Sequence, residues 1–277
     1  MAKDFNGRVV VVTGAASGIG RETALAFARR GARLSLCDVN EDGLHEVKSE
    51  AEACGCLEAR VESVDVSDRH QVERFCDNTY AELGRVDILV NNAGVGMGGK
   101  FEDLSLEDWE WIMGINLWGE IYGCYYFYPR MIKDGGGHIV NVASGAAVAP
   151  LPLMTAYCCT KGGVKSFSET LRAEAKLHNI GVSTICPGLV RTNITKTARY
   201  CTEADRKLNE RVDRFYEWRN YPPSKVAAAI VRAVEKNRGV VLVAPETYME
   251  DATYRLSRRF WQSLASQSVR FSERFLD

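Results

Sequence analysis

The feature that most constrains the fold lies near the N-terminus, where an apolar strand leads directly into a glycine-rich turn and a helix. Residues 8–13 form an apolar, β-branched run with the length and composition of a strand buried in a parallel sheet. Residues 14–20 are rich in glycine, and apolar side chains then recur at helical spacing until Gly31. This order predicts the first unit of a doubly wound α/β sheet.

The glycine turn has the chemistry of a phosphate-binding loop. Glycines let the backbone approach a pyrophosphate closely, and the helix N-terminus offers unpaired N–H groups and the positive end of its dipole. Gly14, Gly18 and Gly20 have the spacing G-x-x-x-G-x-G, which differs from the general dinucleotide pattern G-x-G-x-x-G. Taken alone, the cluster leaves two interpretations open: a dinucleotide site, or a tight turn without a ligand.

Asp38 favours the dinucleotide site. It follows the predicted strand 33–37 and lies about 20 residues beyond the glycines, where an acidic side chain accepts hydrogen bonds from the adenosine ribose hydroxyls. An acid there repels a 2′-phosphate, and the next residues, Val39 and Asn40, supply no cation to receive one. The pocket therefore indicates NAD rather than NADP. A second role for Asp38, as the N-cap of the following helix, is compatible with the first.

A catalytic pair is predicted at Tyr157 and Lys161. Their spacing places both side chains on one face of a helix, where the ammonium favours the phenolate and makes the phenol an acid–base catalyst. An isolated pair of this kind is more often two solvated surface residues. Here Ser144, at the end of the predicted strand 138–142, adds a hydroxyl that can donate to a substrate oxygen.

Together these motifs resemble the short-chain dehydrogenase/reductase family, in its compact single-domain subfamily, over residues 5–245. Residues 13–20 are similar to its cofactor loop, 65–66 to its adenine contact, 91–94 to the turn after its fourth strand, and 187–192 to the segment that holds the nicotinamide carboxamide. The resemblance implies a catalytic tetrad of Asn116, Ser144, Tyr157 and Lys161. The NAD contacts that it implies are Gly14, Ser17, Gly18, Ile19, Gly20, Asp38, Asp65, Val66, Asn92, Ala93, Gly94, Tyr157, Lys161, Pro187, Gly188, Val190 and Thr192.

Each member of the tetrad has an expected role. Tyr157 carries the proton while the nicotinamide carries the hydride, and Lys161 also holds the nicotinamide ribose. Ser144 donates to the substrate oxygen, and Asn116 holds a water that relays the proton outward. The alternatives are a cap or loop hydroxyl for Ser144 and a buried amide bonded to backbone for Asn116. No G-x-S-x-G elbow surrounds Ser144, which disfavours a serine hydrolase.

We therefore expect an NAD-dependent oxidoreductase that acts on a secondary alcohol or ketone. Two alternatives stay open: an NADP-dependent ketone or ketoacyl reductase, and a non-catalytic dinucleotide-sensing protein on the same fold. The segment 192–222 is expected to form a substrate lid with Tyr200, Phe215, Tyr216, Trp218 and Tyr221, over a floor of Val148, Leu151, Leu153 and Met154. Such walls favour an apolar or aromatic substrate, whether steroid-like, terpenoid, aryl or long-chain.

The expected fold is a single Rossmann-type domain, residues 1–246, with about seven parallel strands and helices on both faces. The strands are placed at 8–13, 33–37, 59–64, 87–91, 138–142, 182–185 and 240–243. The helices around 117–132 and 156–177 carry more apolar and aromatic surface than one face of the sheet can bury, and this surface includes Tyr122, Tyr125, Tyr126 and Phe127. The excess predicts a homodimer or homotetramer.

Residues 247–277 form an extension that the resemblance does not cover. Leu256, Phe260 and Leu264 recur at helical spacing, and Trp261, Val269, Phe271, Phe275 and Leu276 lie near them, so an amphipathic helix is expected. Packing against its own or a neighbouring subunit is favoured over peripheral contact with an anionic membrane or a loose end.

Composition excludes several other classes. The 35 basic and 36 acidic residues give a net charge of −1 and no basic footprint for nucleic acid. No apolar run reaches the roughly 18 residues of a membrane span, and the start has no signal-peptide core. The nine cysteines and four histidines lack metal-ligand spacing, so we expect no metal, free thiols and a cytoplasmic location.

Overall fold

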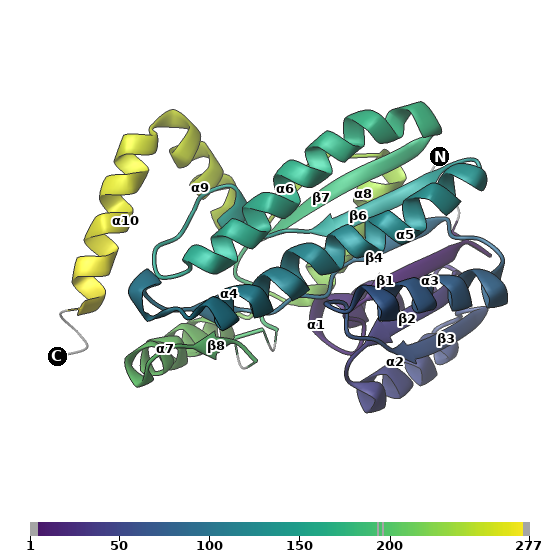
Figure 1. Ribbon diagram of the computed structural model, residues 1–277, viewed down its shortest axis with the longest axis horizontal. Coiled ribbons are helices and arrows are strands. Elements are labelled where there is room, and N and C mark those ends of the chain that lie inside the picture. The colour runs from purple at the N-terminus through teal and green to yellow at the C-terminus, as the bar shows by residue number, and fades with distance from the viewer. Residues whose placement is uncertain (1–4, 193, 196, 274–277) are drawn as a thin grey trace.

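The computed structural model describes residues 5–192, 194–195 and 197–273 (Figure 1). Its centre is a parallel sheet in the order β3-β2-β1-β4-β6-β7-β9. The strands are β1 (Val9–Thr13), β2 (Arg33–Asp38), β3 (Glu58–Ser63), β4 (Ile88–Asn91), β6 (Gly137–Val142), β7 (Ile180–Pro187) and β9 (Val240–Val243). The seven strands predicted from the sequence are confirmed, and so is the doubly wound fold.

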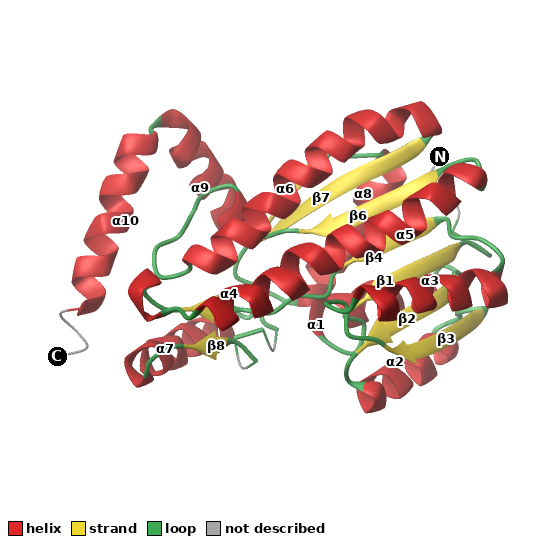
Figure 2. Cartoon of the chain, in the orientation of Figure 1, coloured by secondary structure: helices red, strands yellow, loops and turns green. Residues whose placement is uncertain are grey.

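Helices cover both faces of the sheet (Figure 2). They are α1 (Gly18–Ala28), α2 (Glu41–Ala53), α3 (Arg69–Leu83), α4 (Leu106–Met113), α5 (Gly119–Lys133), α6 (Thr155–Ala175), α7 (Glu203–Arg219), α8 (Pro223–Lys236), α9 (Pro245–Leu256) and α10 (Arg258–Glu273). One core cluster joins α1, α2 and α8 to the sheet, and another joins α3, α5 and α6 to its opposite face.

Strand β1 shows why these residues form a central strand. Val10 and Val12 pack into the cluster under α1 and α8, whereas Val9 and Val11 pack into the cluster under α3 and α5. All four side chains are fully buried. Full burial of an aliphatic side chain contributes roughly 1.5–3 kcal/mol, so a strand that is apolar on both faces is stabilised only between two helix layers.

The order of the strands places a crevice beside β1. The chain runs outward from β1 through β2 to β3 and then returns to β4, on the other side of β1. The loops after β1 and β4 therefore leave the sheet in opposite directions. In open α/β sheets ligands bind outside the carboxyl ends of the strands at this point.

The predicted lid contains regular structure. Residues Arg199–Tyr200 form β8, which pairs with β5 (Met97–Gly98), and α7 follows. Trp218 is 80% exposed, and Tyr221 packs against the core cluster of α1 and α8, so neither lines the cavity. The side chains of Phe215 and Tyr216 lie outside the described residues.

The C-terminal extension forms two helices, so the single amphipathic helix predicted from Leu256, Phe260 and Leu264 is wrong. α9 ends at Leu256 and α10 begins after Ser257, so the three side chains do not share one helix. They are all exposed. The indole Nε1 of Trp261 donates to the backbone oxygen of Pro150 at 2.8 Å, which ties α10 to the loop before α6. Phe271, Phe275 and Leu276 have side chains outside the described part of the chain.

The start of the extension belongs to the packed domain. Thr247 is fully buried, so the predicted boundary between residues 246 and 247 falls inside α9. On α5, Phe127 is buried in the core and is not part of the surface surplus, whereas Tyr125 is 69% exposed. No helix in the described ranges is long and apolar enough to cross a bilayer.

Candidate active site

A cavity of about 720 Å³ opens at the carboxyl ends of the sheet strands. The turns after β1, β2, β4, β6 and β7 and the first turns of α1 and α9 line it, together with one face of α6. Every residue that the sequence assigned to catalysis or cofactor binding lines this cavity, except Asn116 and Gly20.

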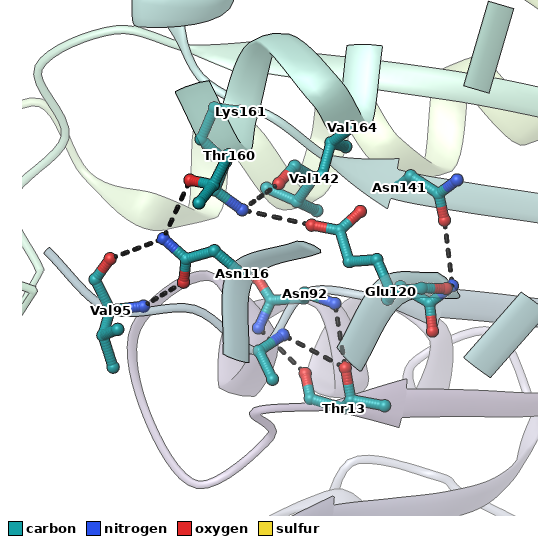
Figure 3. A network of polar contacts seen from close by, with 12 residues as sticks. Thr13, Asn92, Val95, Asn116, Glu120, Asn141, Val142, Thr160, Lys161 and Val164 are labelled. Atoms are coloured by element: carbon teal, nitrogen blue, oxygen red, sulfur yellow. Dashed lines mark hydrogen bonds and ion pairs between the residues drawn. The ribbon is translucent and has the colours of Figure 1, made fainter. Parts of the chain in front are cut away.

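The glycine turn is tied to the turn after β4 by hydrogen bonds (Figure 3). The hydroxyl oxygen of Thr13 accepts from the backbone N–H groups of Asn92 and Ala93, both at 3.0 Å. The side-chain amide of Asn92 donates to the carbonyl oxygens of Thr13 and Gly14, at 3.0 and 3.1 Å. Gly14 has a φ of +64°, and a Cβ there would lie 2.7 Å from the Cα of Ala93, so only glycine fits.

Gly20 acts through packing. A Cβ on Gly20 would lie 2.0 Å from the carbonyl oxygen of Gly14. Because glycine has no Cβ, α1 can approach the turn closely. Ser17 is the N-cap residue of α1, and its side chain makes no capping bond. Ser17, Gly18 and Ile19 line the cavity, where the N-terminus of α1 offers unpaired N–H groups. These donors fit a pyrophosphate.

Asp38 is held at the end of β2 by two backbone donors. Its carboxylate accepts from the N–H of Ala16 and the N–H of Asn40, each at 3.0 Å. The N-cap role predicted for Asp38 is wrong, because Asn40 caps α2 by accepting from the N–H of Gly43. Lys161 is the only basic residue among the described residues that line the cavity. The part of the cavity around Asp38, where the sequence predicts the adenosine, therefore presents a fixed acid and no described cation.

Asp65 and Val66 line the same side of the cavity, after β3. One carboxylate oxygen of Asp65 accepts from the N–H and the hydroxyl of Ser67, at 2.9 and 2.7 Å. Val66 packs against Gly119, where a Cβ would lie 2.9 Å from the valine side chain. Pro187, the last residue of β7, lines the cavity as well, and so do Gly188, Val190 and Thr192, which follow it.

Three of the four residues of the predicted catalytic tetrad line one cavity. Tyr157 and Lys161 come from α6 and are almost fully buried, and Ser144 follows β6. The Ser144 hydroxyl also accepts from the N–H of Ala146 at 3.2 Å. It therefore also has the capping role that the sequence left open. Lys161 Nζ donates to the carbonyl oxygen of Val142 at 2.7 Å and to Glu120 Oε1 at 3.1 Å (Figure 3).

Asn116 does not reach the cavity. It lies fully buried in a π-helical turn, Gly114–Trp118, between α4 and α5. Its side-chain oxygen accepts from the N–H of Val95 at 2.8 Å, and its amide nitrogen donates to the carbonyl oxygen of Val95 at 2.9 Å. The structure therefore shows the buried amide that the sequence left as the alternative. Through Val95, Asn116 shapes the cavity wall.

Glu120 was missed at the sequence level. It is 2% exposed in the first turn of α5, and its carboxylate pairs with Lys161. Burial raises the pKa of Glu120 to about 7, although Lys161 opposes the shift. A signal was present, because Glu120 is the only charged residue between Glu110 and Arg130. A lone carboxylate in an apolar stretch needs a buried partner.

The substrate side combines apolar walls with carboxylates of α9. Leu151, Leu153 and Met154 line it as predicted, whereas Val148 packs into the core against Val164 and is not part of the floor. Glu246 accepts from the N–H of Leu189 at 2.7 Å and pairs with Arg219. Glu250 lines the cavity, and burial, together with Glu246, raises its pKa. Among the described residues Glu250 has no hydrogen-bond or ion-pair partner.

The nine cysteines are free. Within the described ranges, no three His, Cys, Asp or Glu side chains gather as metal ligands.

Comparison with known proteins agrees with this geometry. Residues 8–201 match the family model of short chain dehydrogenases. The chain is 44% identical over 268 residues to the probable oxidoreductase EphD of Mycobacterium tuberculosis, which covers 95% of this chain and 45% of EphD. The chain thus spans less than half the length of that relative. It is 36% identical to 11-beta-hydroxysteroid dehydrogenase-like 3 of Arabidopsis thaliana, covering 89% of this chain and 74% of the other.

A solved structure is also similar. A short chain dehydrogenase/reductase from Burkholderia phymatum in complex with NAD superposes with a TM-score of 0.85 at 32% identity, covering 92% of this chain and 94% of that one.

Proposed function

The chain belongs to the short-chain dehydrogenase family of oxidoreductases, and we propose that it transfers hydride between NAD and a secondary alcohol or ketone. The observation that carries this proposal is the convergence of Tyr157, Lys161 and Ser144 on the cavity that also receives the glycine turn and Asp38. One cavity thus joins a dinucleotide cradle to a proton carrier.

The residues of the cavity have separate roles in this reaction. Bound NAD supplies the hydride acceptor. Tyr157 takes the proton of the alcohol oxygen during oxidation and returns it during reduction, and Lys161 places a positive charge on the same face of α6. Ser144 donates to the substrate oxygen, where charge develops. A relay water at Asn116 stays a prediction, because the side-chain amide of Asn116 already bonds to Val95.

The cofactor preference rests on Asp38. Its carboxylate is fixed by Ala16 and Asn40 at the cavity, where a negative charge disfavours a 2′-phosphate, and the described lining offers only Lys161 as a cation. The similar Burkholderia structure was solved with NAD. We therefore favour NAD over NADP.

For the substrate we propose an apolar or aromatic secondary alcohol. Leu151, Leu153, Met154, Met97 and Ile194 supply apolar wall, and one relative carries the name of a hydroxysteroid dehydrogenase-like protein. Glu250 favours a second candidate, an alcohol with an additional hydrogen-bond donor such as a hydroxyl or an ammonium. A half-buried carboxylate without a described partner is stabilised by such a donor.

A panel of secondary alcohols and ketones, assayed with NAD(H) and NADP(H) by nicotinamide absorbance, tests the proposal. We expect turnover with apolar or aromatic members and at least a tenfold preference for NAD, which corresponds to about 1.4 kcal/mol. If NADH binds but no member of the panel is oxidised or reduced, the non-catalytic alternative is favoured instead.

We also propose a symmetric oligomer through α5 and α6. Trp118 and Tyr125 remain 47% and 69% exposed at or near α5, and Trp118 stacks on Tyr122 with ring centroids 5.5 Å apart. A partner copy would bury these rings. Light scattering that detects only monomer at micromolar concentration would refute this assembly.

A further inference from the structure

Glu120 is the one buried carboxylate that contacts a proposed catalytic side chain among the described residues. It enters the site from the first turn of α5, and its Oε1 lies 3.1 Å from the ammonium of Lys161 on α6 (Figure 3). Its second oxygen, Oε2, is buried and has no hydrogen-bond partner in the described part of the chain.

Stability alone does not account for this carboxylate. Desolvation of two charges is unfavourable, and replacing a buried ion pair by apolar side chains is often neutral or stabilising. The buried Oε2, which has no hydrogen-bond partner among the described residues, adds a further cost. An apolar residue at this position of α5 would be expected to stabilise the fold at least as well. The charge of Glu120 is therefore better explained by a role in the active site.

The geometry around Lys161 indicates what the charge does. An ammonium has three hydrogens. Val142 accepts one at 2.7 Å and Glu120 accepts another, which leaves the third for the cavity that Lys161 lines. A Cβ on Gly94 would lie 3.4 Å from Nζ, so the ammonium is close to the cavity wall on that side as well. Glu120 thus fixes the direction of the remaining donor.

We propose that Glu120 is a positioning residue of the reaction: it anchors the Lys161 ammonium and offsets part of the positive charge that Tyr157 experiences. The inference rests on the proposed function and adds to it an electrostatic control that acts through Lys161. A negative charge on Glu120 weakens the electrostatic effect that the Lys161 ammonium has on the site, and loss of that charge strengthens the effect.

Among the groups around Glu120, only Lys161 pairs with it as a charge. The titratable groups that interact with it are Lys161, on α6, and Cys124, one turn further along α5. Burial and then Glu120 raise the pKa of Cys124 to about 12, so this thiol stays neutral. The strands β4 and β6 contribute the neutral amides of Asn91 and Asn141 near Cys124. Since burial raises the pKa of Glu120 to about 7, its charge changes near neutral pH.

The test compares the pH dependence of kcat for alcohol oxidation in wild type and Glu120→Gln. The amide keeps the size and one acceptor oxygen but removes the charge. We expect the rising limb of the profile to move to lower pH by about one unit, because removal of a negative charge lowers the pKa of a nearby acid. Glu120→Leu also removes the acceptor, so Lys161 loses its anchor and Kd for NADH should rise at least about tenfold, a loss of about 1.4 kcal/mol.

The matched control is Glu110→Gln, the same chemical change at an exposed glutamate of α4. Its profile should coincide with that of wild type. Thermal melts establish that each variant is folded. Should Glu120→Gln melt far below wild type, Glu120→Asp replaces it: the charge stays but retreats from Lys161, so its profile should lie between those of wild type and the charge-free case.

The outcomes are distinguishable. If wild type turns over no alcohol or ketone, the proposed function fails and this inference with it. If wild type is active and the folded Glu120 variants keep its pH profile, the proposed function stands and the role of Glu120 is refuted.

Discussion

The two ends of the cavity are built in different ways. At the dinucleotide end, backbone groups from parallel strand ends are held by hydrogen bonds, such as those of Thr13 to Asn92 and of Asp38 to Ala16. At the substrate end, apolar side chains such as Leu153 and Ile194 form the wall, and Glu250 has no described partner. Hydrogen-bonded backbone is rigid and specific, whereas an apolar wall accepts different shapes.

The contrast implies that changes at one end should leave the other end intact. Tyr157 and Lys161 line the same cavity from α6, and in the proposed reaction they act on both the cofactor and the substrate. Substitutions can therefore be ordered by which end they affect.

The largest effect is expected where the two ends meet. Tyr157→Phe removes the proposed proton carrier and keeps the ring, so turnover should fall by at least about 10²-fold, the usual loss of general acid–base catalysis. NADH affinity, measured by fluorescence titration, should stay within about twofold of wild type. Retained turnover would mean that another group moves the proton.

A change at the dinucleotide end should alter the cofactor preference alone. Asp38→Ala combined with Val39→Arg removes the acid and adds a cation at a position that is 69% exposed, so NADP should gain on NAD by about tenfold or more in kcat/KM. The ranking of alcohols should not change. A reordered substrate ranking would show that the two ends are coupled.

A change at the substrate end should do the reverse. Glu250→Gln removes the unpaired charge, so substrates with a second donor should lose several-fold in kcat/KM, about 1 kcal/mol, and purely apolar ones should not. Because burial raises the pKa of Glu250, wild type should bind ammonium-bearing alcohols more tightly as pH rises and the carboxyl ionises. Glu246 is already paired with Arg219, so we do not expect the neighbouring Glu246 to show this pH dependence of substrate binding.

The smallest effect is expected from α10, which contacts the loop before α6 through Trp261 and Pro150. Deletion of residues 258–277 should lower the affinity for bulky apolar substrates by a few-fold or destabilise the oligomer, without any change in NAD preference. If the truncated chain keeps wild-type kinetics and assembly but no longer sediments with anionic vesicles, the packing role is wrong and membrane contact replaces it.

Much of the fold and of the dinucleotide end could be predicted from the sequence. Strand β1 had to be buried on both faces, because its run of valines offers no polar face, and the glycines after it admit only a close turn. The residues around Asn116 were harder to interpret. The sequence left open whether that amide holds a relay water or bonds to the backbone, and only the tertiary structure shows its two hydrogen bonds with Val95.

What the sequence determined by itself is local: the strand positions, the glycine turn, the acid at the end of β2 and the spacing of Tyr157 and Lys161. Only the tertiary structure decided that Glu120 reaches Lys161 across 41 residues of sequence, that α9 brings Glu250 into the cavity, and that the C-terminal apolar residues split between two helices. The physical reason is that periodicity and backbone preference act over a few residues, whereas the pairing of a buried charge depends on which distant elements the packed core brings into contact.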